Sequence, residues 1–213
     1  MRPTPVEPGG LRRFVAREAT RLMDVVASPP VNQPRPTAEA VTERLLVLGA
    51  AAEVCVTIMV HGCAWSLPVQ ELVWVELLDR LLNLPEPLLG YQAWLALRSY
   101  PAVLALYGGG LAAVANGHDE LLLTLLTRPV RRSSGPPQPL DGLLTDPAGP
   151  MGARLFGRLP GLEHHSTPAS EYLYWTLRQP LARYCSDERR YRRTFDRFEY
   201  LSALIQADRQ GGR

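Results

Sequence analysis

The stretch 88–127 constrains the fold of this chain more than any other stretch. It is the densest apolar block in the sequence, and residues typical of helix starts and helix ends divide it. Ser99, with Pro101 two residues later, predicts a helix start: the hydroxyl can accept an orphan N–H, and a first-turn proline loses only an unpartnered one. Asn116 and Gly117 predict the end of this helix, since both residues tolerate the left-handed conformation. Acidic residues at 119–120 then favour the start of a second helix. The stretch therefore predicts two apolar helices joined by a tight turn.

Three consecutive glycines, Gly108, Gly109 and Gly110, lie inside the first of these helices. Each costs about 1 kcal/mol relative to alanine in a helix interior, so close packing or a kink must compensate. A phosphate-binding loop would place such glycines between a strand and a helix, with a lysine or a helix N-terminus at the phosphate. Here they lie within an apolar helical run, and the chain contains no lysine. The glycines therefore predict close helix packing.

This helix pair resembles one tetratricopeptide repeat over a window of about 34 residues. Gly110, Ala112 and Gly117 stand where that motif prefers small residues, and Pro129 follows the second helix. Leu122 stands where the motif prefers alanine, and no second copy occurs at a fixed period. A generic helical hairpin is therefore the preferred interpretation.

The remaining segments also carry helical patterns. Residues 11–27 are amphipathic, and the proline-rich stretch 28–36 separates them from a long apolar helix that Thr37 is expected to cap. Ser66 and Pro68 are expected to begin a further helix, and Pro85 and Pro87 to bracket a turn. Within that long helix, 45–60 is the strongest membrane candidate. It is shorter than the ~18–20 residues of a span and contains an acidic residue, which favours a buried core helix.

The C-terminal third contains an irregular segment and then a regular helix. Residues 128–167 are rich in helix breakers and predict a long irregular loop. Ser186 is expected to cap the last helix, and residues with helical spacing line its apolar face: Tyr191, Phe195, Phe198, Ser202 and Ile205. We expect an all-α fold of about six or seven helices in an antiparallel bundle or array of helical hairpins. Residues 1–36 form an N-terminal helix plus linker, and residues 37–213 form the helical domain.

Composition narrows the functional classes. All 23 basic residues are arginine, and the net charge of +2 does not demand a polyanionic partner. Three widely spaced cysteines argue against a disulfide framework, and no signal peptide is visible, so we expect a cytoplasmic protein without a membrane partner. No nucleotide-binding or zinc-ligand motif occurs, and we expect no cofactor and no metal. The arginine bias is typical of a GC-rich, actinobacterial genome.

The leucine-rich helices, YPAVLALYGGGLAAVANG and the closing FDRFEYLSALIQAD carry a second resemblance. Over about 40–127 and 187–208, the chain resembles helical C-terminal regions of large multidomain bacterial proteins, several of them linked to antiphage defence. This resemblance involves no catalytic residues. It implies an accessory or sensing module of a bacterial defence or signalling system.

The leading hypothesis is a non-catalytic helical interaction module that binds a protein partner or itself. One small domain is not expected to bury all four tryptophans, which are the candidate contact residues: Trp65, Trp74, Trp94 and Trp175.

The first alternative is nucleic-acid binding through the arginine-rich face of the last helix, formed by Arg189, Arg192, Arg193 and Arg197. A solvated face is the simpler interpretation, because Arg192 reaches Asp196 one helical turn later. A basic loop at Arg128, Arg131 and Arg132 carries less weight.

A second alternative is an enzyme of unrecognised type. Its candidate residues are His61 with Cys63, or His164 with His165. Cys55 and Cys63 can share a helix face, with His61 to one side, but this geometry more often indicates buried small side chains. Adjacent histidines do not face the same way on regular structure, and no cysteine stands near them at metal-ligand spacing.

Overall fold

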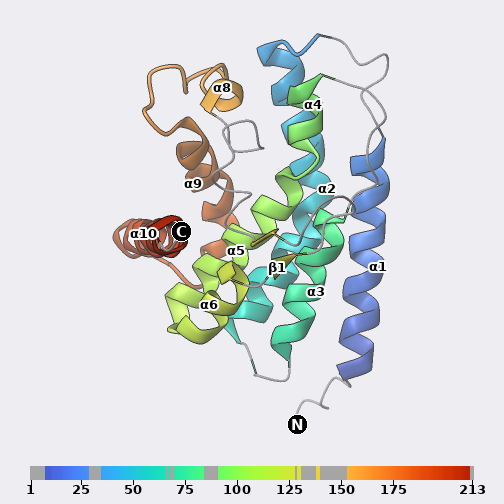
Figure 1. Ribbon diagram of the computed structural model, residues 1–213, viewed down its shortest axis with the longest axis vertical. Coiled ribbons are helices and arrows are strands. Elements are labelled where there is room, and N and C mark those ends of the chain that lie inside the picture. Colours follow the sequence, from blue (N-terminus) through green and yellow to red (C-terminus); the bar gives the residue numbers. More distant parts are fainter. Residues whose placement is uncertain are drawn as a thin grey trace.

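The computed structural model describes residues 8–28, 35–65, 67, 70–83, 91–127, 129–130, 138–139 and 153–211. It confirms the all-α fold (Figure 1). Within these residues, the seven helices of nine or more residues are α1 (Pro8–Ala27), α2 (Ala38–Ala64), α3 (Glu71–Leu82), α5 (Tyr100–Asn116), α6 (Asp119–Thr127), α9 (Pro168–Leu181) and α10 (Glu188–Gly211). The shorter elements are α4 (Gln92–Leu97), α8 (Ala153–Phe156), β1 (Pro129–Val130) and β2 (Gln138–Pro139). The two strands pair antiparallel, with Pro129 opposite Pro139.

Helix α5 is the centre of the fold, and α2, α3, α6, α9 and α10 all pack against it. All of its residues from 100 to 114 are buried. A Cβ atom at Gly108 would lie 3.1 Å from Val60 Cγ2, and one at Gly109 would lie 2.7 Å from Met59 Cε, both on α2. A Cβ atom at Gly110 would lie 2.2 Å from Cε2 of Phe198 on α10. The three glycines thus let α2 and α10 approach α5 closely, as the sequence predicts.

The ends of α5 agree only in part with the sequence signals. Gly117 has a φ of 74°, so the predicted left-handed helix end is confirmed. Ser99 occupies the N-cap position, but its side chain makes no capping hydrogen bond, contrary to expectation. Ser99 has φ −86° and ψ −5°, which is a helical conformation rather than the extended one that side-chain capping requires.

Helix α2 begins as predicted, because Thr37 Oγ1 accepts a hydrogen bond from the backbone N–H of Ala40 at 3.2 Å. Its 27 continuous residues make it the one helix, in the part of the chain that the structure describes, that is long and apolar enough to cross a membrane. The expectation that the apolar stretch is too short is therefore wrong. Core helices pass the same test, and one side of α2 packs on α5 and α1.

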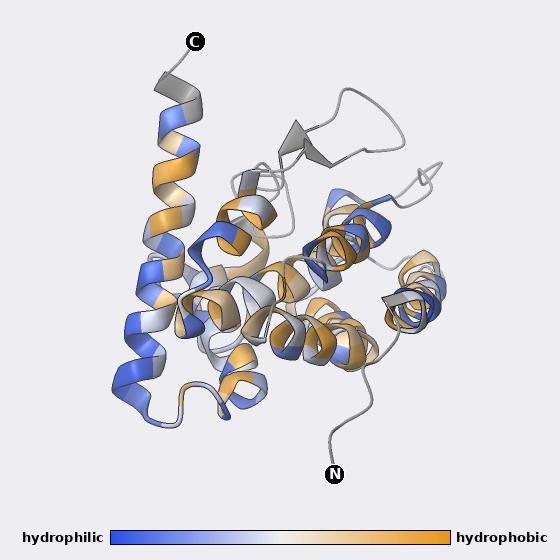
Figure 2. Cartoon of the chain, turned by 90° about the horizontal axis from the view of Figure 1, so that it is seen from below, coloured by the Kyte–Doolittle hydropathy of each residue, from blue (hydrophilic) through white to orange (hydrophobic). Residues whose placement is uncertain are grey.

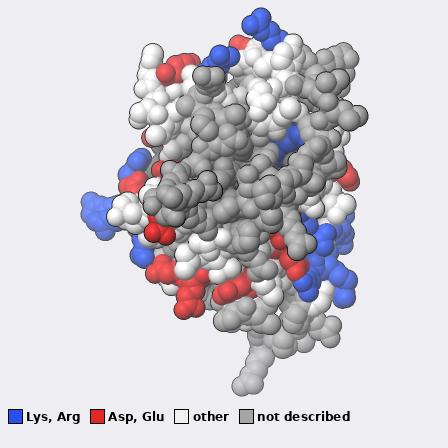
Figure 3. Space-filling model, in the orientation of Figure 1, with Lys and Arg blue, Asp and Glu red and all other residues white. Residues whose placement is uncertain are grey.

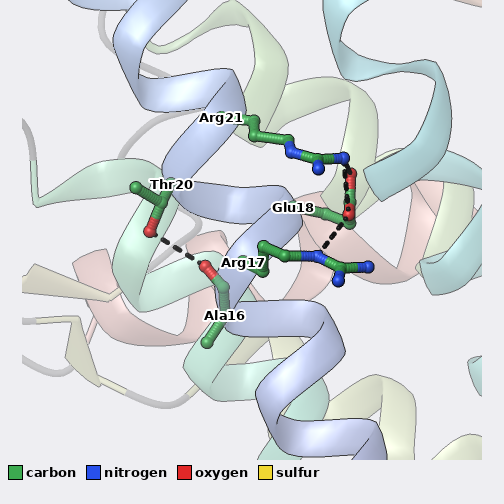
Figure 4. A network of polar contacts seen from close by, with 5 residues as sticks. All are labelled: Ala16, Arg17, Glu18, Thr20 and Arg21. Atoms are coloured by element: carbon green, nitrogen blue, oxygen red, sulfur yellow. Dashed lines mark hydrogen bonds and ion pairs between the residues drawn. The ribbon is translucent and has the colours of Figure 1, made fainter.

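Helix α1 packs on α2 and α3, while the division of the chain at residue 36 stays a prediction. Arg12 pairs with Glu76 on α3, with Nε 2.7 Å from Oε2. Glu18 is buried, and Figure 4 shows two arginines reaching its carboxylate. Arg17 Nε and Arg21 Nη1 each donate to Oε1 at 3.1 Å. These contacts give the buried charge the partners that it requires.

Helix α10 crosses the other helices and is seen end-on in Figure 1, and its C-terminal end projects from the bundle in Figure 2. Its predicted apolar face is confirmed: Tyr191, Phe195, Phe198 and Ser202 are buried, and Ile205 packs at the edge. The predicted cap at Ser186 is wrong by one residue. Asp187 Oδ1 accepts the N–H of Arg190 at 2.8 Å, and a carboxylate is also favourable at this positive helix end.

Some of the predicted loop, turn and helix-start residues lie outside the residues that the structure describes. Of the expected irregular loop 128–167, the structure describes the β1–β2 pair, α8 and the turns up to residue 167. The following predicted positions lie outside the described residues: Ser66, Pro68, Pro85, Pro87, Arg128, Arg131 and Arg132.

Candidate interaction groove along helix α10

Two adjacent pockets lie along one side of α10, and Arg197 lines both of them. We call them together the α10 groove. Its basic half has a volume of about 440 Å³ and is lined by Val114, Ala115, Asp187, Arg189, Arg190, Arg193, Thr194 and Arg197. Its apolar half, between α6 and the C-terminal part of α10, has a volume of about 700 Å³ and is lined by Asp119, Leu122, Leu123, Thr127, Arg197, Leu201, Leu204, Ile205 and Asp208.

Unpaired cations dominate the basic half. Arg189 and Arg193 are exposed and form neither an ion pair nor a hydrogen bond with another described residue. Arg190 Nη2 donates to the carbonyl of Ala115, at the end of α5, at 3.2 Å. Figure 3 shows arginine side chains at the edge of the molecule over α10, with acidic side chains below them over α6. This half therefore attracts carboxylates or phosphates.

The predicted arginine set is only partly brought together. Arg189, Arg193 and Arg197 line the groove, but the guanidinium of Arg192 lies 4.4 Å from the ring centroid of Tyr174, where it makes a cation–π contact. It does not pair with Asp196 as the sequence suggested. Sequence reasoning missed Arg190, although its spacing of three and seven residues from Arg193 and Arg197 is the signal of a shared helix face.

An ion pair marks the boundary between the two halves. Arg197 Nη2 lies 3.2 Å from Oδ1 and 3.3 Å from Oδ2 of Asp119, on α6. Both side chains are more than half exposed, so the pair contributes only about 0–1 kcal/mol to stability. It neutralises Arg197, which leaves Arg189 and Arg193 as the strongest anion-binding groups.

The apolar half presents leucines to solvent. Leu123 on α6 is 53% exposed, and Leu204 on α10 is 46% exposed. Leu122 and Ile205 lie deeper between the two helices, and Asp208 lines the far end. The sequence predicts an apolar helix here and did not indicate that Leu123 lies at the surface. Apolar side chains gathered at a groove are typical of interaction sites.

The four candidate tryptophans divide into two groups. Trp65 is 70% exposed and Trp175 is 57% exposed, so both remain accessible to a partner. Trp74 and Trp94 are only 2% and 6% exposed and belong to the core. A Cβ atom at Gly62 would lie 2.3 Å from the Trp74 ring, so the indole fills the space that this glycine leaves. Trp74 and Trp94 are therefore unsuitable as contact residues.

The catalytic candidates do not converge. Cys63 is fully buried, and burial raises the pKa of its thiol far above the usual range. His61 is exposed, with Nδ1 2.6 Å from the hydroxyl of Tyr184. Residues two apart on a helix point in nearly opposite directions. His61 and Cys63 therefore do not form a nucleophile–base pair.

The second catalytic candidate, His164 with His165, also lacks the geometry of an active site. His164 and His165 are exposed, and His165 Nδ1 lies 4.0 Å from Glu171 Oε1. Among the residues that the structure describes, no group of three potential ligands is placed to hold a metal ion.

Comparisons of the chain with known protein families, curated proteins and solved structures find no match. The resemblances to a tetratricopeptide repeat and to helical regions of bacterial defence proteins stay predictions.

Proposed function

We propose that this protein is a non-catalytic helical interaction module, and that the α10 groove binds an acidic and apolar segment of a protein partner. One observation carries the proposal: two unpaired arginines follow one side of α10, and beside them exposed Leu204 of the same helix and exposed Leu123 of α6 line the continuation of the groove. Carboxylates of the partner are attracted to Arg189 and Arg193, while its apolar side chains cover Leu123 and Leu204. Charge selects the partner and apolar burial supplies affinity.

The length of the groove suggests the form of the ligand. Residues 189–208 of α10 line it, and at a rise of 1.5 Å per residue they span about 28 Å. An amphipathic helix of about 19 residues has the same length. Helices commonly bind by laying an apolar face into such a groove. We place this module in the cytoplasm as an accessory part of a bacterial defence or signalling system, which the resemblance over 40–127 and 187–208 supports.

The test is fluorescence anisotropy with a labelled amphipathic peptide that carries glutamates in its first half and leucines at helical spacing in its second half. We expect Leu204→Gln and Arg193→Ala each to raise the Kd about tenfold, which corresponds to about 1.4 kcal/mol. Leu72→Gln and Arg13→Ala are matched controls, because both residues are exposed on other helices, and their Kd should stay within twofold. A peptide that does not bind, or binds all variants equally, would refute the proposal.

Nucleic-acid binding is a second candidate, because Arg189 and Arg193 are unpaired and Tyr200, 63% exposed, is available for base stacking. It predicts affinity for short DNA or RNA that falls linearly with log salt. Arg193→Ala would weaken this binding, whereas Leu204→Gln would leave it unchanged, so the leucine variant separates the two candidates. Absence of binding at low salt eliminates this one.

A further inference from the structure

A second uncovered surface lies on α2, on the side away from α5. Three of its apolar side chains are exposed: Leu46 by 64%, Val47 by 45% and Val54 by 46%. Three acidic residues, Glu39, Glu43 and Glu53, are exposed as well. All six lie within residues 39–54 at spacings that place them on one side of a helix. We call this surface the α2 face.

The α2 face carries negative charge without compensation. Glu43 and Glu53 form no ion pair with another described residue. Arg44 is the one arginine in α2, and its Nη2 is directed to the end of α1, where it donates to the carbonyl of Val25 at 3.2 Å and that of Ser28 at 2.9 Å. An acidic and apolar helical surface is the chemistry that the α10 groove requires.

We propose that the partner in the α10 groove is the α2 face of a second copy of this chain, so that molecules associate head to tail. This inference rests on the function proposed for the groove. Glu39 and Glu43 would lie near Arg189 and Arg193, and the exposed aliphatic side chains would cover Leu123 and Leu204. The α2 face extends over about 23 Å and the groove over about 28 Å, counted from their residues at 1.5 Å each.

Charge decides between this arrangement and a symmetric dimer. Two α2 faces packed on each other would bring together carboxylates from both copies, and two facing grooves would bring together arginines. Juxtaposed like charges oppose association. The complementary pairing joins different surfaces, so each pair keeps one free α2 face and one free groove, and the assembly can grow.

The experiment is sedimentation velocity over a concentration series of the full chain. We expect the mean mass to rise beyond that of a dimer as concentration increases. Leu46→Asp blocks the α2 face and Leu204→Asp blocks the groove, so each variant alone should stay monomeric. An equimolar mixture of the two should stop at a dimer, because only one intact face and one intact groove can meet. Leu72→Asp, on α3, is the matched control and should associate like the wild type. Far-ultraviolet circular dichroism verifies that each variant is folded.

Charge reversal provides a second arm. Glu43→Arg and Arg193→Glu should each abolish association, and the double variant should restore it. A wild type that is monomeric at all concentrations, or a mixture of the two blocked variants that stays monomeric, overturns the inference. If the labelled peptide still binds the groove in that case, only self-association fails; if the peptide does not bind either, the function proposed for the groove fails with it.

Discussion

Gly110 is a position where one added methyl group should have a large effect on stability. In Gly110→Ala, the new Cβ would lie 2.2 Å from Phe198 Cε2 and 2.9 Å from Cδ2, well inside van der Waals contact. Phe198 is fully buried, so its ring has no free space to move into and α10 must shift. Overpacking costs about 1–3 kcal/mol, and a contact this short belongs to the upper part of that range, about 2–3 kcal/mol; the better helix propensity of alanine returns about 1 kcal/mol.

We therefore expect Gly110→Ala to lower the free energy of unfolding by about 1–2 kcal/mol, which corresponds to a fall in Tm of about 2–8 °C for a chain of this size. Urea unfolding followed by circular dichroism measures the free energy directly. Phe198→Leu in the same chain should recover part of the loss, because the smaller side chain leaves room for the methyl group. A Gly110→Ala variant as stable as the wild type would refute the close contact between α5 and α10.

Gly49 provides the matched control for the same substitution. It also lies inside a helix, but a Cβ atom there would meet nothing within 4 Å. Gly49→Ala should therefore raise the free energy of unfolding by about 0.8–1 kcal/mol, from helix propensity alone. Destabilisation at this site would mean that its surroundings are not open.

Three further outcomes follow from burial. Trp65→Phe together with Trp175→Phe should remove most of the iodide-quenchable fluorescence, because the other two tryptophans are buried; unchanged quenching would contradict their placement. Burial raises the pKa of Cys55 to about 11, and all three cysteines are buried. The folded protein should therefore not react with DTNB at mildly alkaline pH, whereas three thiols should react after unfolding. Burial also raises the pKa of Glu199, whose Oε1 accepts a hydrogen bond from Tyr107 at 3.3 Å. When the pKa of a carboxyl is higher in the folded state than in the unfolded state, the folded protein loses stability as pH rises through the folded-state pKa. Glu199→Gln should therefore be more stable than the wild type at pH 7, and this advantage should disappear below about pH 4, where the carboxyl of the unfolded chain is also protonated; an advantage independent of pH would argue against this cause.

The local part of the candidate site could be predicted from the chain. Arg189, Arg193 and Arg197 share a side of α10 because helical spacing alone places them there. Arg192 shows the limit of that reasoning, since an aromatic ring of another helix, Tyr174, takes the contact that the sequence pattern assigned to Asp196. Arg192 departs from the sequence pattern because its contact depends on which helix packs beside α10, and spacing within α10 does not determine that.

Surfaces formed by separate helices could not be predicted in this way. Asp119 and Arg197 are 78 residues apart, and their ion pair exists because α6 packs beside α10. Leu123 belongs to an apolar run that predicts burial, yet it is exposed at the groove. Of the four tryptophans, no sequence pattern indicated which two would enter the core.

Helix class, helix boundaries and the small residues at close contacts were determined by the chain itself, because backbone hydrogen bonds, caps and side-chain spacing act over a few residues. The groove, the α2 face and the burial of each aromatic ring were decided by tertiary packing. Each of them depends on which helix sides remain uncovered, and that is settled only when segments distant in the chain pack together, as α10 does against the glycines of α5.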